Sequence, residues 1–251
     1  MATIINIPIT SWNQECSPAT QEHALHALEE GGVLFFPHLG FLIEEVENQF
    51  LSPAIVGKSK NVSFDISTGK LRGSSVGEAE IKLLKNMMQR FATYGNDLLF
   101  NLLPHYKAGL MESRTSFRPA EIVDRQTSWR KDDTRLHVDS FPSLPVHDKR
   151  ILRVFSNVNP QGKSRFWRLG ESFESVASRY LSSLTNPVWG ISQLLQLCGI
   201  TKSRRSTYDH FMLQLHDRIR HSAPHHVNNI LNCVHQLRTL EIGIERGLFL
   251  Q

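Results

Sequence analysis

A histidine and an aspartate, His137 and Asp139, stand two residues apart at the end of the segment WRKDDTRLHVD. Alternate residues of a β-strand point to the same face, so the imidazole and the carboxylate of such a pair can reach one metal ion. Two imidazoles and one carboxylate on one side of an octahedron are the ligands of non-haem Fe(II) oxygenases. The pair therefore predicts a strand that carries part of a metal site. The alternative is a pair of surface residues that binds no metal.

Two arginines offer a cation for an acidic molecule bound beside such a metal. A cosubstrate with two carboxylates needs a buried cation at its distal end, and the arginine fork binds a carboxylate through two hydrogen bonds. Arg153 lies within the apolar run RILRVF, where it shares a face with Ile151 and Phe155. A charged residue in a buried strand is uncommon unless it is paired, so a structural salt bridge is the alternative. Arg118, in SFRPAEI, is a second candidate, although a loop arginine at such a place is often only solvated.

The composition indicates a globular chain long enough for one large domain or two small ones. It has 251 residues, of which 40% are hydrophobic and 21% are charged, as in ordinary soluble proteins. The N-terminus has neither a basic start nor a long apolar stretch, and no window is apolar enough to span a membrane, so we expect a cytoplasmic protein. The cysteines are widely spaced and lack a CxxC pattern, which indicates reduced thiols: Cys16, Cys198 and Cys233.

The net charge of +4 favours anionic partners such as a phosphorylated lipid, an acidic sugar or nucleic acid, but an ordinarily solvated surface explains it equally well. No zinc-finger or RNP-like pattern supports nucleic acid as a partner. A candidate patch for an anionic surface lies in a polar segment, where a solvated basic loop is the alternative. Its residues are Lys58, Lys60, Lys70 and Arg72.

The pattern of apolar and turn-forming residues predicts an α+β chain of one domain. Residues 1–105 are expected to be mostly helical, residues 106–220 to form a β-rich core, and residues 221–251 to form a tail. The predicted helices are Ser17–Gly31, Phe41–Leu51, Glu78–Leu103, Glu171–Leu184 and Tyr208–Arg220. The predicted strands and extended segments are Val33–Phe36, Thr115–Asp124, Leu136–Val138, Arg150–Val158 and Phe166–Leu169. Gly57–Gly77 is either an ordered loop or a short hairpin.

The other histidines are weaker candidates for a third metal ligand. The helix predicted for Tyr208–Arg220 carries His210 and His216, which we expect at the surface or in structural hydrogen bonds. Its buried face is expected to consist of Phe211, Leu215 and Ile219. His235 is the most plausible third ligand by its distance along the chain from His137, although its segment has a helical pattern. Solvated loop residues are the better interpretation of three others: His221, His225 and His226.

Five blocks of the sequence together resemble the hydroxylases of 3-deoxy-D-manno-oct-2-ulosonic acid (Kdo). The longest block is SWRKDDTRLHVDSFPSLPVHDKRILRVFSNVNP, from Ser128 to Pro160. The others are GKSKNVSFDISTGKLRG, FRPAEI, FWRLGESFE and YDHFMLQLHD. The resemblance runs from about Ile5 to Arg220, and several long blocks in order make it far more specific than the His-x-Asp pair.

These hydroxylases are bacterial Fe(II)/2-oxoglutarate-dependent dioxygenases that act on the outer Kdo sugar of lipopolysaccharide at its 3-position. The resemblance implies a double-stranded β-helix, or jelly-roll, core with N-terminal and flanking helices. It implies His137 and Asp139 as iron ligands, Arg153 and Arg118 as contacts for 2-oxoglutarate or the acidic sugar, and O2 as the oxidant. The substrate would be Kdo-bearing lipid A, met by a cytoplasmic protein that visits the inner face of the inner membrane.

The C-terminal sequence departs from this family. Family members continue with strands and a Thr-Asp-Gln-Val-x-His segment that carries the third iron ligand, whereas this chain reads APHHVNNILNCVHQLRTLEIGIERGLFLQ beyond about Ser222. Apolar residues there follow a helical spacing, so the last strands of the jelly roll are expected to be missing or altered. They are Val227, Ile230, Val234 and Leu237.

A frameshifted reading frame explains the departure, and so does divergence in which His235 or His226 replaces the usual ligand. Two further hypotheses stay open besides an active hydroxylase. One is a degenerate or truncated family member that binds sugar or lipid without turnover. The other is a cupin-like metal enzyme of other specificity.

Overall fold

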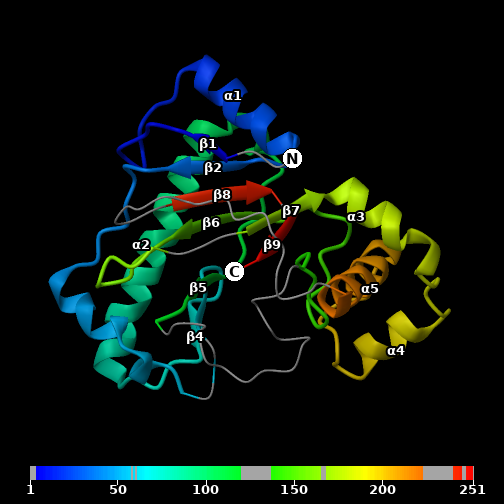
Figure 1. Cartoon of the computed structure of the whole chain (residues 1–251). Coiled ribbons are helices and arrows are strands. Elements are labelled where there is room, and N and C mark those ends of the chain that lie inside the picture. The colour runs from blue at the N-terminus through cyan, green and yellow to red at the C-terminus, as the bar shows by residue number, and fades with distance from the viewer. Residues whose placement is uncertain are drawn as a thin grey trace.

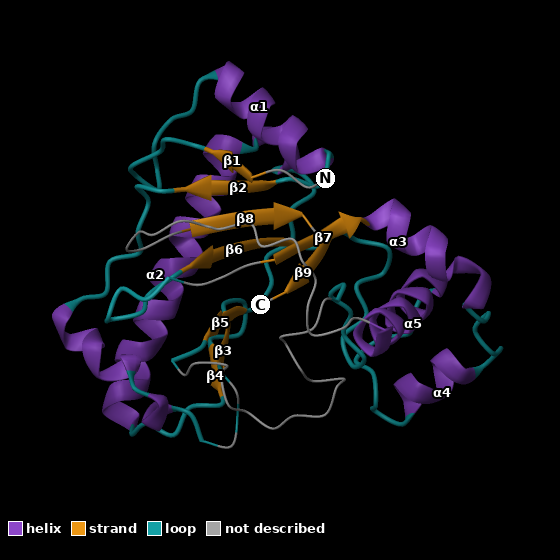
Figure 2. Ribbon diagram, viewed as in Figure 1, coloured by secondary structure: helices purple, strands orange, loops and turns teal. Residues whose placement is uncertain are grey.

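The computed structural model describes residues 4–57, 59, 61–119, 137–164, 168–222, 240–244 and 247–250. Within them the strands form three sheets. Two long helices accompany the largest sheet, and a separate group of three helices lies to the right of it in the view of Figures 1 and 2. This α+β arrangement agrees with the predicted class.

The largest sheet has four strands in the order β1 (Ile4–Asn6), β2 (Val33–Phe36), β8 (Leu240–Ile244) and β6 (Leu152–Ser156). β1 runs parallel to β2, whereas β8 is antiparallel to both of its neighbours. The predicted strands VLFF and RILRVF both form, because β-branched and aromatic residues suit a pleated, half-buried surface. A strand from the end of the chain thus lies between one from its beginning and one from its middle (Figure 1).

The expectation that the last strands are missing is wrong for the part of the tail that the structure describes. β8 is a strand, and so is β9 (Gly247–Leu250), which pairs with β7 (Arg168–Ser172) in a two-stranded sheet. The sequence LEIGI has apolar residues at alternate positions, which is the period of a strand: Leu240, Ile242 and Ile244. The helical spacing over 227–237 lies outside the described residues.

A second sheet contains β4 (Lys70–Arg72), β3 (Val62–Asp65) and β5 (Thr115–Phe117), all antiparallel. The hairpin of β3 and β4 confirms one of the two interpretations of this polar segment. Its turn is stabilised by the carboxylate of Asp65. This carboxylate accepts hydrogen bonds from the Ser67 hydroxyl at 2.7 Å and from the backbone N–H of Thr68 at 3.2 Å. The Ser67 hydrogen bond is the main cause that lowers the pKa of Asp65 to about 2.

The main core lies between the largest sheet and two helices, α1 (Pro18–Glu29) and α2 (Glu78–Leu102), which form close to their predicted bounds. The Ser17 hydroxyl caps α1 by accepting a hydrogen bond from the N–H of Thr20 at 3.2 Å. The largest fully buried side chains of this core include Leu28, Leu34, Phe36, Phe50, Leu84 and Leu98. Each contributes about 1.5–3 kcal/mol by leaving water.

The helix predicted over Phe41–Leu51 is instead the shorter 3-10 segment η1 (Glu45–Leu51). Contacts with α2 explain the difference. The Arg90 guanidinium on α2 pairs with the buried Glu47 carboxylate at 2.6 Å and also with Glu44. These ion pairs hold the start of the segment against α2 in a tight turn, which the amphipathic pattern does not reveal.

The second helical group consists of α3 (Phe173–Tyr180), α4 (Ile191–Leu197) and α5 (Thr207–Ser222). α3 is shorter than the predicted Glu171–Leu184 and continues into a 3-10 turn, whereas α4 was not predicted. The described part of residues 106–220 holds these three helices besides β5, β6 and β7. Residues 120–136 and 165–167 lie outside the described residues, so the β-rich core expected for 106–220 stays a prediction. The short 3-10 segments are η2 (Pro53–Ile55), η3 (Pro104–Tyr106) and η5 (Leu181–Ser183).

The α3–α5 group has a smaller apolar core of its own, formed by Val138, Val176, Met212, Leu215 and Ile219. No helix in the described parts of the chain is both long enough and apolar enough to cross a membrane.

Candidate functional site

His137 and Asp139 lie where the α3–α5 group meets the segment that leads into β6. His137 is buried, with 5% of its surface exposed, and its Nε2 lies 3.6 Å from Asp139 Oδ1. Val138 between them packs into the smaller core with Met212 and Leu215 of α5. The described residues form no strand here beyond a single β-bridge at His137. The expected alternation of side chains is nevertheless present: the apolar residue enters the core, and the two polar side chains face each other.

The geometry of this pair fits two adjacent positions of one metal ion. Bonds of about 2.1 Å at a right angle place two ligand atoms about 3 Å apart, so the observed separation needs only a small side-chain rotation. Both side chains are nearly inaccessible to water, and a cation would stabilise the buried carboxylate. Among the described residues, no group of three His, Cys, Asp or Glu side chains is arranged to hold a metal.

Arg153, from β6, forms an ion pair with the second carboxylate oxygen of Asp139. Its guanidinium carbon also lies 5.9 Å from the centre of the Phe141 ring and 6.0 Å from that of Phe155. The structural salt bridge foreseen as an alternative is thus present. A metal at Asp139 would neutralise its charge and weaken this ion pair, which would make the guanidinium available to another carboxylate. The role of Arg153 toward a cosubstrate stays a prediction.

His216 of α5 lies beside His137 and is not at the surface, whereas its contact with Asp217 agrees with the alternative of a structural residue. The centres of the two rings are 5.8 Å apart, in an edge-to-face arrangement, and the His216 side chain is 12% exposed. Its Nδ1 lies 3.2 Å from Asp217 Oδ1. The helical spacing could have indicated that His216 is buried. His216 lies four residues after Met212 and one after Leu215, which are both buried in α5.

α5 buries most of the predicted face, with one residue exchanged. Leu215 and Ile219 are buried as expected, but the third buried apolar residue is Met212, whereas Phe211 is only half-buried. Two charged residues, Asp209 and Arg220, are buried as well. The Nε2–H of His210 donates a structural hydrogen bond to the carbonyl oxygen of Thr185, 2.9 Å away, because a carbonyl oxygen can only accept.

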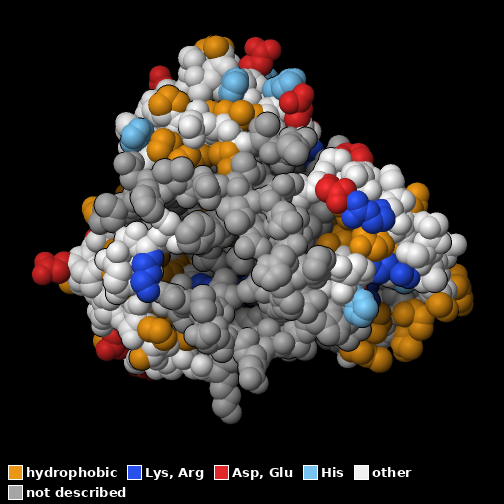
Figure 3. All heavy atoms as spheres, in the orientation of Figure 1, with side chains coloured by type: hydrophobic (Ala, Val, Ile, Leu, Met, Phe, Trp, Pro, Cys, Tyr) orange, Lys and Arg blue, Asp and Glu red, His pale blue; other side chains and the backbone are white. Residues whose placement is uncertain are grey.

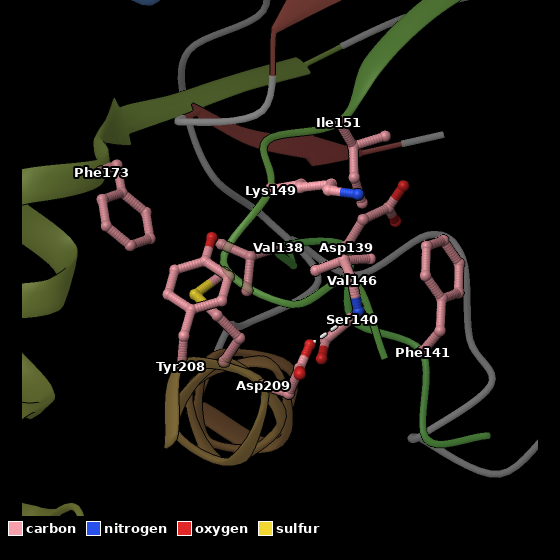
Figure 4. A pocket seen from close by; sticks show the side chains of 11 residues that line it. Val138, Asp139, Ser140, Phe141, Val146, Lys149, Ile151, Phe173, Tyr208 and Asp209 are labelled. Carbon is pink, nitrogen blue, oxygen red and sulfur yellow. Dashed lines mark hydrogen bonds between the residues drawn. The ribbon is translucent and has the colours of Figure 1, made fainter. Parts of the chain in front are cut away.

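A pocket opens beside Asp139 (Figure 4). Phe141 and Lys149 line it from the segment before β6, Tyr208 from the start of α5, and Phe173 from α3. Its walls are mostly aromatic or aliphatic, with a carboxylate, an ammonium and a phenol among them. Such a mixture suits a small polar ligand that is oriented by a few charged groups. The sequence analysis did not single out Lys149, Tyr208 or Phe173.

Asp209 holds the pocket wall in place. Its Oδ1 accepts hydrogen bonds from the backbone N–H of Val146 at 2.7 Å and of His147 at 3.3 Å, and the first of these is drawn in Figure 4. His147 and Asp148 both have positive φ angles, of 52° and 65°, which side chains other than glycine rarely adopt. Burial acts to raise the pKa of Asp209, but hydrogen bonds from Ser206, Val146 and His147 lower it overall.

Several predicted site residues are not brought to this pocket or lie outside the described part of the chain. Arg118 follows β5 and is half-buried, and it does not line the pocket. Lys70 and Arg72 are exposed on β4. Those outside the described residues are Lys58, Lys60, His226 and His235.

Comparison with a family model and with solved structures identifies related proteins. The family model, described as 3-deoxy-D-manno-oct-2-ulosonic acid (Kdo) hydroxylase, matches residues 11–233. No curated protein sequence matches the chain. The match to the family model ends before β8, so the last two strands lie beyond it.

Solved structures of the Kdo hydroxylase KdoO, a non-heme Fe(II) alphaketoglutarate-dependent dioxygenase, resemble the fold. The complex with alphaketoglutarate and Fe(III) is 40% identical with a TM-score of 0.89. The complex with cobalt(II) is 41% identical with a TM-score of 0.90, and the complex with succinate and Fe(III) is 40% identical with a TM-score of 0.87. Each match covers 98% of this chain and 83% of the relative.

Proposed function

The chain belongs to the Kdo hydroxylase family, and from this premise we propose that it hydroxylates the outer Kdo sugar of lipid A at its 3-position, with Fe(II), 2-oxoglutarate and O2. The observation that carries the proposal is the buried pair of His137 and Asp139 with Arg153 ion-paired beside it. A metal ligand pair next to a cation is what a site for Fe(II) and an acidic cosubstrate requires.

The side chains of this site have distinct roles in the proposed reaction. When bound, the iron with 2-oxoglutarate and O2 supplies the oxidant for hydroxylation, and succinate and carbon dioxide leave. His137 and Asp139 would hold the metal, and Arg153 would bind a carboxylate of 2-oxoglutarate. Arg118 is a second contact for the cosubstrate or for the acidic sugar. The apolar walls of the pocket exclude water from the reacting centre.

The fold proposed with this function is a double-stranded β-helix. Support comes from the antiparallel run of β2, β8 and β6 and from the separate antiparallel pair of β7 and β9. β6 supplies Arg153, which forms an ion pair with Asp139.

The substrate and the location proposed are those of a peripheral enzyme. The sugar is carried by lipid A, so the protein would work in the cytoplasm at the inner face of the inner membrane. Both the sugar acid and the lipid phosphates are anionic, and the net charge of +4 favours their approach.

Cobalt(II) binding to His137→Ala tests the metal site apart from turnover. Absorption of bound Co(II) in the visible range should appear with the wild-type protein and be lost with His137→Ala, because one of two identified ligands is gone. His23→Ala, at an exposed position of α1, is the matched control and should bind as the wild type does. Equal binding by His137→Ala would remove the metal-site assignment.

Succinate release with Kdo-bearing lipid A, measured together with the mass of the lipid product, tests the reaction. Substrate-dependent succinate and a hydroxylated sugar are expected from the wild type and from His23→Ala. Cobalt binding without substrate-dependent succinate would instead support the second candidate, a family member that binds without turnover. The observation that favours that candidate is the sequence beyond about Ser222, which departs from the family's Thr-Asp-Gln-Val-x-His segment.

A further inference from the structure

Large apolar side chains are exposed to solvent along one continuous stretch of the chain, around α4. Trp189 is 93% exposed and Leu197 is 84% exposed. The other members of this surface, which we call the α4 surface, are Leu181, Val188, Ile191, Leu194 and Ile200. In Figure 3 hydrophobic side chains gather at the lower right, where α4 lies in Figure 1. A protein surface rarely exposes so many large apolar residues together unless they meet a partner or a membrane.

α4 has the reverse of the usual amphipathic orientation. Ile191, Leu194 and Leu197, spaced three apart, point their apolar side chains to solvent. On the other side the hydroxyl of Ser192 donates a hydrogen bond to the backbone carbonyl of Arg205 at 2.8 Å. Leu195, three residues after Ser192, is half-buried. The helix therefore contacts the protein through Ser192 and Leu195 and presents its other large apolar side chains outward, the arrangement expected of a helix that lies on a lipid interface.

Cations border the α4 surface, and no anions lie among them in the sequence. Lys202 and Arg204 are exposed just after α4, and Arg205 is half-buried beside them. Between Leu181 and Ser206 the sequence has no Asp or Glu. Apolar residues with a border of positive charge match a membrane that carries anionic lipids, in which tryptophan prefers the headgroup level.

The segment just after α4, residues 202–205, is hydrogen-bonded to the segment that lines the pocket beside Asp139. The backbone N–H of Lys202 donates to the Ser143 carbonyl at 3.0 Å, and an Arg205 guanidinium N–H donates to the Pro142 carbonyl at 2.5 Å. A third contact joins His147 Nε2 to the Arg204 carbonyl oxygen, 3.0 Å apart. These contacts connect the segment just after α4 to the segment that lines the pocket, so a membrane under α4 would lie on that side of the pocket.

We propose that the α4 surface is where this protein docks on a membrane of anionic lipids, so that a lipid-linked sugar reaches the pocket beside Asp139. The identity of the lipid-linked sugar as the ligand depends on the proposed function. The binding of the α4 surface to a membrane does not depend on it. A second copy of the chain is the less suitable occupant. In a two-fold contact the same surface faces itself. Lys202 and Arg204 would then lie opposite the same two cations of the second copy and be repelled by them.

Sedimentation of the full-length protein with lipid vesicles tests the docking surface. The wild type should bind vesicles of phosphatidylcholine with phosphatidylglycerol more tightly than vesicles of phosphatidylcholine alone. Leu194→Gln with Leu197→Gln should weaken binding about tenfold or more, because two apolar side chains no longer enter the lipid. Lys202→Gln with Arg204→Gln should weaken binding about tenfold on the anionic vesicles only. Glutamine keeps the helix propensity of leucine nearly unchanged, and circular dichroism checks that both variants fold.

Matched pairs elsewhere on the surface serve as controls. Leu42→Gln with Val46→Gln removes two apolar residues that are also exposed, and Lys82→Gln with Lys107→Gln removes two exposed cations that lie outside both candidate basic surfaces. Both should bind vesicles as the wild type does. Trp189 supplies an independent readout: its fluorescence should shift to shorter wavelength with vesicles and be quenched by brominated lipid, and Trp189→Phe should lose this change.

Three results would overturn the proposal. The first is unchanged binding by the Leu194 and Leu197 variant. The second is an equal loss of binding in either control pair. The third is a wild-type dimer that this variant dissociates, with no vesicle binding by either, which would make a second copy the occupant.

Docking and chemistry are separated by two further measurements. His137→Ala should bind vesicles like the wild type, and the Leu194 and Leu197 variant should release succinate normally when the lipid substrate is dispersed in detergent. If no succinate forms in any sample but binding still depends on α4, the proposed function fails while the docking surface stands. If succinate forms but binding does not depend on α4, the docking surface is wrong while the proposed function stands.

Discussion

At the residue scale, the ion pair between Arg153 and Asp139 joins the two predicted halves of the site. The pair forms because β6 places Arg153 beside the segment that carries Asp139. In the absence of a metal, the guanidinium balances the charge of a carboxylate that is almost buried. A bound metal would take over that balance, and the guanidinium would then attract an acidic cosubstrate.

Arg153→Gln should raise the KM for 2-oxoglutarate about tenfold to a hundredfold, because it removes a charged hydrogen-bonding partner. The effect on kcat at saturating cosubstrate should be smaller. Arg179→Gln, which removes an arginine paired at the surface with Glu171, is the control. Cobalt(II) affinity should be retained or increased, since a competitor for Asp139 is lost. An unchanged KM would exclude Arg153 from cosubstrate binding.

The His-x-Asp spacing could be read as a metal pair from the sequence alone, because the two-residue period of a strand fixes which side chains share a face. The neighbourhood of His216 could not be read in this way. It depends on how α5 packs across Val138, a contact between residues far apart in the sequence.

At the element scale, the first turn of α5 is tied to the pocket wall by one side chain. Asp209 Oδ2 accepts hydrogen bonds from the backbone N–H and the hydroxyl of Ser206, and the Ser206 hydroxyl accepts from the Asp209 N–H. This reciprocal cap satisfies the free N–H groups at the start of the helix. The other carboxylate oxygen holds the strained turn at His147.

Asp209→Asn should lower the free energy of unfolding at pH 7 by about 2 kcal/mol, because hydrogen bonds to a charged acceptor are lost. The pKa of Asp209 is lower in the folded protein than its ordinary value. The charge therefore stabilises the fold above the unfolded pKa of about 3.9, and this contribution disappears as the pH falls through the folded pKa. Denaturant unfolding over a range of pH should show the difference between the two proteins narrowing on acidification.

Glu174→Gln, at an exposed position of α3, serves as the control for that measurement. It should unfold like the wild type at every pH. A difference between Asp209→Asn and the wild type that stays constant as the pH falls would contradict the assigned role of the charge.

α4 shows why some elements escape a reading of the sequence. A search for helices assumes that the apolar side of an amphipathic helix packs into the core. α4 is only seven residues long, and its apolar residues point to solvent instead. The spacing of apolar residues therefore does not predict α4. By contrast, α2 has 25 residues, and its apolar residues follow the spacing of an amphipathic helix.

At the scale of the whole molecule, the sheet beside the site is closed by the end of the chain. β8 pairs with β2 through the register of Ile242 with Leu34, and with β6 through that of Ile242 with Val154. Without β8, the strands β2 and β6 would each present an unpaired edge. The position of Arg153 on β6 therefore depends on residues that follow it by almost a hundred positions.

Ile242→Pro should destabilise the protein by about 3 kcal/mol or more, because proline removes a ladder hydrogen bond and has no place in a central strand. Ile242→Val keeps a β-branched residue, which suits a strand, and is the control. The midpoint of thermal unfolding and the amount of soluble protein measure the effect. Equal stability of the two variants would show that β8 does not pair inside the sheet.

The sequence by itself determined the family, because five blocks resemble it in order. It also determined the α+β class, the bounds of the long helices and the His-x-Asp pair, because periodicity and spacing are local properties of a chain. Three features were decided only by the tertiary structure. They are the position of β8 between β2 and β6, the contact of His216 with His137, and the exposure of apolar side chains on α4. Each of these depends on contacts between distant segments, for which the free-energy gain comes from packing and pairing across the fold and leaves no regular pattern in the sequence.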